Sequence, residues 1–258
     1  MPDPTGTPTV EGLQRELAAA RATIASLRQE QAVFAHGISH DLRAPLRSID
    51  SFVALLARHE GLDDTARGYL ERVRAASARA GSLIDGLLAL SHANRAELAP
   101  APVDLSLLAE WSLAELQEAD AAQPAELDVA PGLLAWGDER LLRQLLGTLL
   151  DNAWKFSRPT GMVRIHVQGA RAGDRLQVAV RDEGLGFDMR YAAKLFLPFQ
   201  RLHGPDQGAG HGIGLAVAQR IAARHDGRLH AESQPGAGAT FHLDLPAPPP
   251  ADAEGSSP

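Results

Sequence analysis

Residues 34–56 read FAHGISHDLRAPLRSIDSFVALL, and their large apolar side chains recur every three or four positions. This spacing places them on one face of a helix. The pattern begins at Val10 and weakens only at Ala20 and Gln31. We therefore predict one long helix whose coiled-coil seam pairs with another chain, bent at Pro45 because a proline removes a helical hydrogen bond. The alternative is an amphipathic helix that packs on its own domain.

A second apolar series indicates another helix over residues 65–93, after a loop near residues 60–62. Asp63 or Asp64 is positioned to cap its first turn. Two helices joined by a short loop form an antiparallel hairpin, and one hairpin covers its own apolar stripe poorly. We therefore expect a homodimer in which two hairpins form a four-helix bundle.

The proline-bearing stretch at residues 98–102 predicts a domain boundary. Helical and alternating patterns are mixed beyond it, which indicates the α+β class, with one sheet and helices on one of its faces. We expect helices at 105–119, 139–156 and 212–225, and strands at 163–169, 176–180, 228–233 and 239–245. The predicted domains are a disordered lead with a coiled-coil helix (1–33), the hairpin (34–98), the α+β unit (103–246) and a disordered tail (247–258).

Composition narrows the classes of function. The chain has 258 residues, a net charge of −7 and no cysteine. Interspersed charges argue against a nucleic-acid-binding surface, and the lack of cysteine excludes disulfides and thiolate zinc sites. No apolar run approaches the ~20 residues of a membrane-spanning helix, and the first residues lack a secretory signal pattern. We expect a cytoplasmic protein that neither inserts into membranes nor binds nucleic acid.

His40 is a candidate nucleophile on the first helix. It lies two residues from Ile38 and Leu42, and two residues turn a helix by about 200°, so it points away from the seam. The neighbouring Asp41 can hold a proton on one ring nitrogen and leave the other to attack. Taken alone, such a histidine is most often an ordinary surface residue. His36 and His40 could also form an i, i+4 metal pair, but no third ligand is evident.

Two segments of the α+β unit carry groups that suit the metal and the base of a nucleotide. In the helix at residues 149–156, Asn152 offers an oxygen to Mg²⁺ and Lys155 offers a positive charge to phosphate. Asp182, directly after a strand, can accept a hydrogen bond from the amino group of adenine. The glycines that follow it allow the backbone to approach the base closely.

Two further segments suit phosphate. Residues 196–203 form an apolar hinge with one arginine. The glycine-rich residues 208–215 lie at the N-terminus of a helix, whose first amides and dipole bind anions. Each segment alone has an ordinary alternative: a glycine run is often only a turn, and Asn152 can be a buried amide bonded to the backbone. Their order and spacing behind a histidine-bearing hairpin favour a nucleotide site.

With these motifs, the chain resembles the sensor histidine kinases of two-component systems. Residues 34–46 are similar to the family's phosphoacceptor box, and the four later segments are similar to its asparagine, first glycine, phenylalanine and second glycine boxes. Residues 236–243 are similar to its closing strand. The sequences of the phosphoacceptor and phenylalanine boxes are most similar to those of kinases attached to phytochrome-type or PAS-type sensors. The resemblance implies a dimeric phosphotransfer hairpin, followed by an ATP-binding sandwich of the gyrase and heat-shock-90 type with a mixed sheet.

The resemblance also implies a role for each matching position. His40 would be the phosphoacceptor and Asp41 its general base. ATP and Mg²⁺ would be bound together, with Asn152 as a ligand of Mg²⁺ and Asp182 as the partner of the adenine amino group. The phosphates would be contacted by Lys155, Arg201, Gly210, Gly212 and Gly214, and the adenine pocket would be formed by Phe156, Gly184, Gly186 and Thr240. The phosphoryl group would pass to a response-regulator receiver domain, and an upstream sensor or a partner would act through the N-terminal coil.

Three positions depart from the family pattern. Thr148 replaces a first asparagine, which puts the Mg²⁺ and phosphate shell in doubt, and His211 replaces a small residue between glycines. Ala44 stands where phosphatase-competent members carry Thr or Asn, so we expect weak phosphatase activity. Two alternatives to an autokinase are a dimeric scaffold or phosphotransfer module without turnover, and an ATPase of the same fold that uses ATP for conformational clamping.

Overall fold

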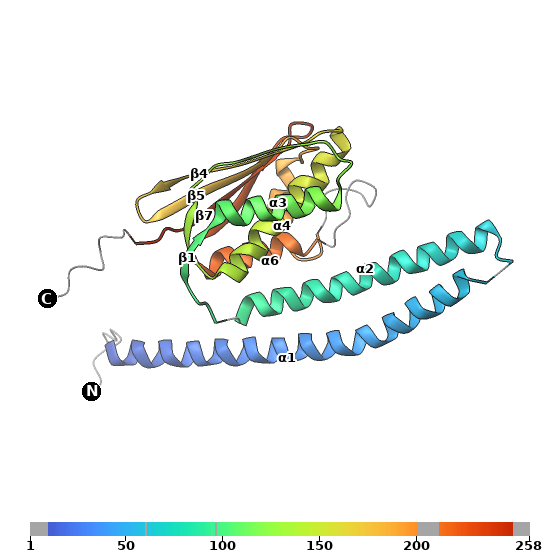
Figure 1. Ribbon diagram of the computed structural model, residues 1–258. Helices are drawn as coiled ribbons and strands as arrows, with labels where there is room; N and C mark the ends of the chain where they lie inside the picture. The colour runs from blue at the N-terminus through green and yellow to red at the C-terminus, as the bar shows by residue number, and fades with distance from the viewer. Residues whose placement is uncertain (1–9, 60, 96, 201–211, 250–258) are drawn as a thin grey trace.

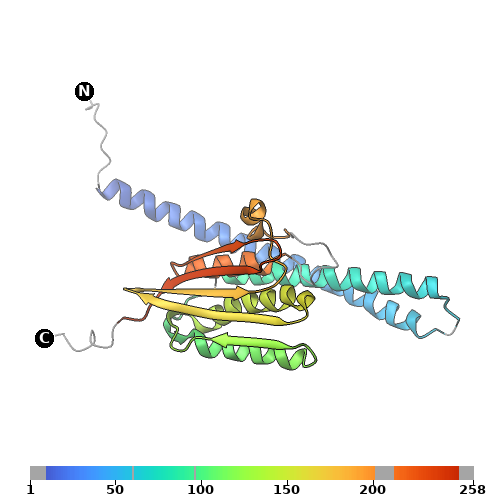
Figure 2. The ribbon, with the colours of Figure 1, turned by 90° about the horizontal axis from the view of Figure 1, so that it is seen from above.

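Two long helices precede the α+β unit in the computed structural model, which describes residues 10–59, 61–95, 97–200 and 212–249 (Figure 1). Helix α1 spans Val10–Ala57 and helix α2 spans Asp64–Arg95, antiparallel to it. Helix α1 continues through Pro45, and its axis turns in the C-terminal part that holds this proline (Figure 1). The predicted hairpin is confirmed, and its tip projects well beyond the α+β unit (Figure 2).

Few side chains are buried between the two helices. Val53 of α1 and Ile84 of α2 are each 7% exposed. Arg43 of α1 donates a hydrogen bond to Asp85 of α2 at 2.7 Å. Among the described side chains of the predicted seam, most of the other large apolar ones remain exposed in a single chain, including Leu42, Ile49, Leu56 and Val73. The hairpin therefore retains an apolar face that its own chain does not cover.

Five strands form one mixed sheet in the order β2-β4-β5-β7-β6. Strand β2 runs parallel to β4, and the other neighbours pair antiparallel. The strands are β2 (Ala125–Val129), β4 (Val163–Ala172), β5 (Arg175–Asp182), β6 (Arg228–Ser233) and β7 (Ala239–Pro246). A separate two-stranded ribbon is formed by β1 (Ala101–Asp104) and β3 (Leu134–Gly137).

Three helices cover one face of the sheet, on the side toward the hairpin (Figure 1). They are α3 (Leu105–Ala119), α4 (Glu139–Ser157) and α6 (Gly214–Arg224). Helix α4 packs its apolar side on the sheet and forms the centre of the core with Leu141, Leu142, Leu145, Leu146, Leu149 and Leu150. The other face of the sheet carries mostly polar side chains, as the alternation along the strands requires.

Side-chain caps explain where three helices begin. Asp63 accepts the N–H of Ala66 at 2.7 Å at the start of α2, so Asp63 supplies the predicted cap. Asp104 and Asp138 accept backbone N–H groups at the starts of α3 and α4. Short helical turns at 158–160, 189–191 and 192–195 complete the fold.

The predicted elements are all present, with ends that differ by three residues or fewer, but β1, β2 and β3 were not predicted. The tail was predicted to begin too early. Ala247 is 8% exposed and its N–H donates to the carbonyl of Asp174 at 2.7 Å, so the α+β unit continues past residue 246. Residues 250–258 lie outside the described residues.

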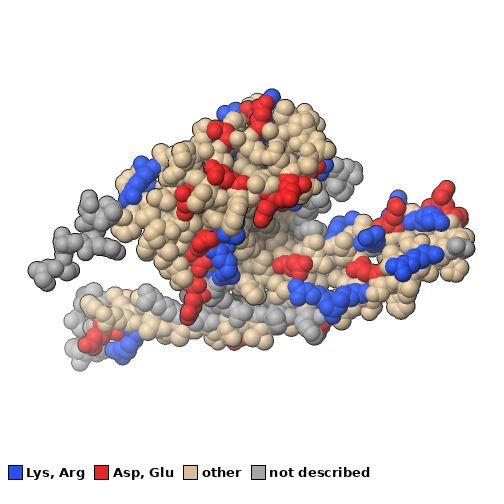
Figure 3. Space-filling view, viewed as in Figure 1, with Lys and Arg blue, Asp and Glu red and all other residues tan. Residues whose placement is uncertain are grey.

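The described residues contain no helix that is both long and apolar enough to cross a membrane. On the face shown in Figure 3, acidic and basic side chains are interspersed on the hairpin and on the α+β unit. The described residues on that face form no continuous basic stripe.

Candidate functional site

A cavity of about 540 Å³ lies where α4, α6 and the segments after β5 meet, with α2 along one side. All four segments predicted to serve a nucleotide contribute to its lining. The predicted site residues that line it are Asn152, Lys155, Phe156, Asp182, Gly186, Gly212 and Gly214. The fold therefore brings together groups that are far apart in the sequence.

Asp182 ends β5 and is 3% exposed. Its Oδ1 accepts the N–H of Gly184 at 2.9 Å and the N–H of Ala239 at 3.2 Å. Both of these bonds go to the same oxygen, which leaves Oδ2 for a ligand. Burial raises the pKa of Asp182 to about 6, and the two backbone hydrogen bonds oppose this rise. Near neutral pH the group is a buried carboxylate, which suits a donor such as an exocyclic amine.

Two glycines shape the loop after β5. A Cβ on Gly184 would lie 2.4 Å from the carbonyl oxygen of Phe156, and a Cβ on Gly186 would lie 2.1 Å from that of Gln234. Gly186 also has a φ of +59°, a conformation that favours glycine. The N–H of Leu185 donates to the Phe156 carbonyl at 3.0 Å. Gly186 lines the cavity, whereas Gly184 lets the loop pack on the end of α4.

Helix α4 presents polar groups to the cavity near its C-terminal end. Asn152 and Lys155 are half-buried there, beside Phe156. Lys155 forms an ion pair with Asp151, one turn earlier on the same helix. The two side chains of this pair are 32% and 40% exposed, so both remain accessible to a ligand. A phosphate that binds Lys155 would compete with this carboxylate.

Thr148, one of the departures from the family pattern, lies on the cavity wall. Its hydroxyl donates to the carbonyl of Gln144 at 2.9 Å, so it bonds within its own helix. Its methyl carbon would lie 2.9 Å from a Cβ on Gly214. Because Gly214 is the first residue of α6, Thr148 faces the start of that helix.

The start of α6 forms the end of the cavity that suits an anion. Amides in the first turn of a helix lack intrahelical acceptors and attract negative charge. Gly212 precedes this turn with a φ of +68°, and a Cβ there would lie 2.4 Å from the carbonyl oxygen of Gln200. Arg201 and Gly210, which were predicted to contact phosphate, lie outside the described residues.

Helix α2 closes the cavity through Ser82, Gly86 and Ala89. A Cβ on Gly86 would lie 2.4 Å from Cδ1 and 2.9 Å from Cβ of Ile213, so a larger residue at this position would require Ile213 to shift. Sequence reasoning missed this wall. The available signal was the spacing of three small residues at i, i+4 and i+7, which places them on one face of α2.

His40 lies in α1, three residues before Arg43, and its side chain is outside the described part of the structure. Arg43 pairs with Asp85, which adjoins Gly86 of the cavity wall. Asp41 is exposed. His40 therefore lies about one helical turn from Arg43, whose ion pair joins α1 to α2, the helix that closes the cavity.

Thr240, which was predicted to support an adenine pocket, does not line the cavity. Thr240 pairs across the sheet with the exposed Arg181 and Glu232, on the face that no helix covers. Ala239, one residue earlier, lines the cavity and donates its N–H to Asp182. The alternating pattern predicted the strand correctly but not which of its two faces meets the cavity.

The residues present fit a magnesium–nucleotide complex. Mg²⁺ prefers carboxylate and carbonyl oxygens together with oxygens of the nucleotide phosphates. Asn152 and Asp151 both line the cavity, where they offer an amide oxygen and a carboxylate oxygen. They lie on α4, which also faces the start of α6, where an anion would bind.

Two family models match consecutive parts of the chain. Residues 30–95 match the His Kinase A (phospho-acceptor) domain. Residues 137–249 match the histidine kinase-, DNA gyrase B-, and HSP90-like ATPase family. The first match covers α2 and the part of α1 that holds His40. The second match covers the cavity residues that belong to the α+β unit.

Individual relatives agree with these matches. The chain is 31% identical over 215 residues to the phytochrome-like protein Cph1 of Synechocystis sp., covering 83% of this chain and 29% of that protein. It is 32% identical over 220 residues to the sensor-like histidine kinase SenX3 of Mycobacterium tuberculosis, covering 83% of this chain and 53% of that protein. The chain thus spans less than two thirds of the length of these relatives. Among solved structures, full-length ShkA in complex with AMPPNP matches with a TM-score of 0.63 and 27% identity, over 85% of this chain and 47% of that one.

Proposed function

As this chain belongs to the sensor histidine kinases of two-component systems, we propose that it transfers a phosphoryl group from ATP to its own His40 and then to an aspartate of a response-regulator receiver domain. The observation that supports this proposal is the position of α2, which forms one wall of the cavity. Helix α2 closes the cavity and also pairs with the helix that holds His40. Donor and acceptor would therefore be held by adjoining elements, and positioning is a large part of phosphoryl-transfer catalysis.

The cavity would bind ATP with its base at one end and its phosphates at the other. Asp182 would accept a hydrogen bond from the adenine amino group, and Phe156 would pack against the ring. Gly212 and Gly214 would offer backbone amides to the phosphates at the start of α6. Lys155 would exchange Asp151 for a phosphate oxygen. Arg201 and Gly210 would also contact the phosphates.

Mg²⁺ would be held by Asn152 and, when bound, would neutralise charge on the phosphates. The protein's own groups would carry the transfer. A ring nitrogen of His40 attacks the terminal phosphorus, and the bond from that phosphorus to the ADP oxygen breaks. The proton on the other ring nitrogen passes to Asp41, which acts as the general base.

We also propose that the working form is a homodimer. Leu42, Ile49 and Leu56 of α1 are between 42% and 51% exposed in one chain, although they belong to the apolar seam. A second hairpin would cover them in a four-helix bundle. Val10, Leu13 and Leu17 are also exposed on the first turns of α1, where an upstream sensor or a partner would act through a coiled coil. A cytoplasmic location is part of this proposal.

Labelling with γ-labelled ATP tests the autokinase. We expect an acid-labile, alkali-stable label on the wild-type chain and none on His40→Gln. His36→Gln is the matched control, because it changes a histidine one turn earlier on α1 and should keep the label. Mass-spectrometric mapping then identifies the labelled residue, and modification of any other side chain would refute the proposal.

The runner-up is a phosphotransfer scaffold without turnover, favoured by Thr148, whose hydroxyl is bonded within α4. Such a scaffold would accept phosphoryl groups from a phosphorylated partner but would not label itself with ATP. An ATPase that works by conformational clamping would release phosphate without any label on the protein.

A further inference from the structure

We infer that the uncovered face of the sheet carries a Zn²⁺ site formed by His230, Glu232 and His242, apart from the nucleotide cavity. Their ligand atoms all lie within 4.8 Å of one another, and no other such group of three occurs among the described residues. Two imidazoles and a carboxylate form a frequent ligand set for zinc, with a fourth position left for water.

Strand pairing brings the three side chains together. His230 of β6 pairs directly with His242 of β7, and their rings stack with centroids 4.8 Å apart. Glu232 is the next residue of β6 on the same face, and its Oε2 lies 3.7 Å from Nε2 of His242. The ligands therefore stand on two hydrogen-bonded strands, which fix their backbones more firmly than a loop would.

One ligand atom of this group lacks a hydrogen-bond partner in the described part of the chain. Nε2 of His242 is buried and has no hydrogen-bond partner among the described residues. A buried polar atom without a partner costs free energy, and a metal ion that accepts its lone pair removes this cost. The neighbour of His242 on β5 is Ala179, which is too small to cover the site from that side.

Binding needs only side-chain movement. Tetrahedral zinc with bonds of about 2.1 Å places its ligand atoms roughly 3.4 Å apart, so the three groups must close from their present spacing. His230 and Glu232 are exposed and can rotate toward His242. The ion would then join β6 to β7 on the face opposite Ala239 and Phe241, which line the cavity.

Titration of the metal-free 258-residue chain with ZnCl₂, without nucleotide, tests the site. Calorimetry should show one more zinc per wild-type chain than per His230→Gln/His242→Gln chain. Any zinc bound at His36 and His40 is retained by both proteins and cancels in this difference. Glu232→Gln should keep the site but weaken it.

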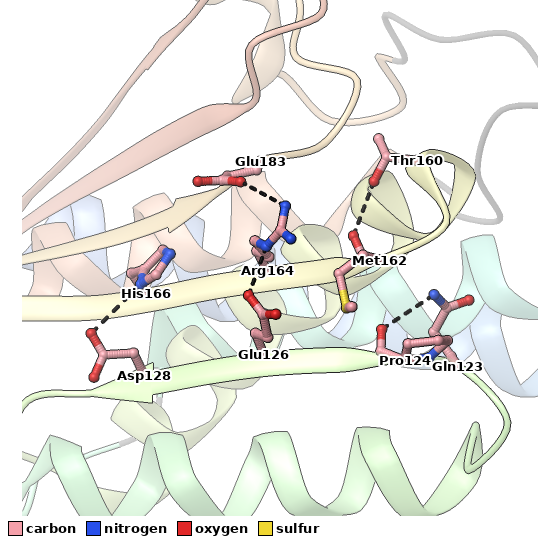
Figure 4. A network of polar contacts seen from close by, with 9 residues as sticks. All are labelled: Gln123, Pro124, Glu126, Asp128, Thr160, Met162, Arg164, His166 and Glu183. Atoms are coloured by element: carbon pink, nitrogen blue, oxygen red, sulfur yellow. Dashed lines mark hydrogen bonds and ion pairs between the residues drawn. The ribbon is translucent and has the colours of Figure 1, made fainter.

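His166→Gln is the matched control, because His166 stands on the same face of the sheet with Asp128 at 3.5 Å (Figure 4). It should bind as much zinc as the wild type. X-ray absorption at the zinc edge should show two imidazole ligands in the wild type, and circular dichroism checks that the variants fold. Equal zinc stoichiometry in wild type and double variant, or a shell of oxygen ligands alone, would overturn the inference. Neither result bears on labelling of His40.

Discussion

Ligand binding favours the ionised form of the Asp182 carboxyl group, whereas folding favours its protonated form. Its pKa rises from 3.8 to about 6 in the folded chain because the carboxyl is buried. The folded chain therefore holds this proton more tightly than the unfolded chain does. The group's contribution to stability is complete below pH 3.8 and is lost as the pH rises through about 6. Above that pH, the ionised carboxylate costs about 3 kcal/mol of folding free energy.

Asp182→Asn should separate the effect on binding from the effect on folding. Asparagine keeps an acceptor oxygen for the N–H groups of Gly184 and Ala239 but carries no charge. We expect the variant to exceed the wild type in unfolding free energy at pH 7.5 by up to about 3 kcal/mol, with an advantage that shrinks below pH 6. Binding of ADP, measured by calorimetry, should be lost. Parallel pH profiles for the two proteins in denaturant unfolding would contradict this prediction.

Thr148 offers a second test at the scale of one residue. Its replacement by asparagine, the family's usual residue, adds an amide oxygen to the cavity. We expect the Mg²⁺ concentration for half-maximal self-labelling to fall by roughly threefold or more. Thr148→Val is the control, because it removes the hydroxyl bond to Gln144 without adding a metal ligand. If both variants need the same Mg²⁺ concentration for half-maximal self-labelling, residue 148 does not contribute to Mg²⁺ binding.

At the scale of elements, the docking of α2 on α6 depends on Gly86. Gly86→Ala would place a methyl group 2.4 Å from Cδ1 of Ile213 and should loosen this docking. Gly81→Ala is the matched control in the same helix, because a Cβ there meets nothing within 4 Å. Both changes favour the helix by up to about 1 kcal/mol. Only Gly86→Ala should speed amide hydrogen exchange around Ile213, and equal exchange in both variants would argue against a tight contact.

The elements show what the sequence can and cannot predict. Long periodic segments such as α1 and α4 were predicted because one chain segment contains the whole pattern. Strands β1 and β3 have only four residues each, and Pro102 weakens the strand signal of β1. Strand β2 alternates, but its parallel pairing with β4 depends on residues far along the chain.

The candidate site divides in the same way. Asp182 and the glycines around it belong to local motifs, which the sequence displays directly. Thr240 was predicted at the cavity, where Ala239 lies, because an alternating strand does not reveal which of its faces is covered. Gly86 and its small neighbours acquire their role only when α2 packs on a distant helix, so no local pattern assigns them to the cavity.

At the scale of the whole molecule, the uncovered seam predicts the oligomeric state. We expect light scattering after gel filtration to give the mass of a dimer. Ile49→Glu should shift the chain toward the monomer, because it places a charge in the seam. Leu134→Glu is the control, because Leu134 has a similar exposure, 46% against 42%, but lies on the ribbon of the α+β unit. A monomeric wild type, or equal effects of both changes, would remove the basis for the bundle.

The wall that Ser82, Gly86 and Ala89 add to the cavity has a thermodynamic consequence. Any affinity that a nucleotide gains from this wall strengthens, by the same factor, the hold of the α+β unit on α2. A twist or shift of the hairpin that withdraws the wall must therefore weaken nucleotide binding, and a bound nucleotide must resist that motion. Reciprocity of this kind lets a mechanical signal in one long helix and the occupancy of a distant pocket regulate each other without a separate relay.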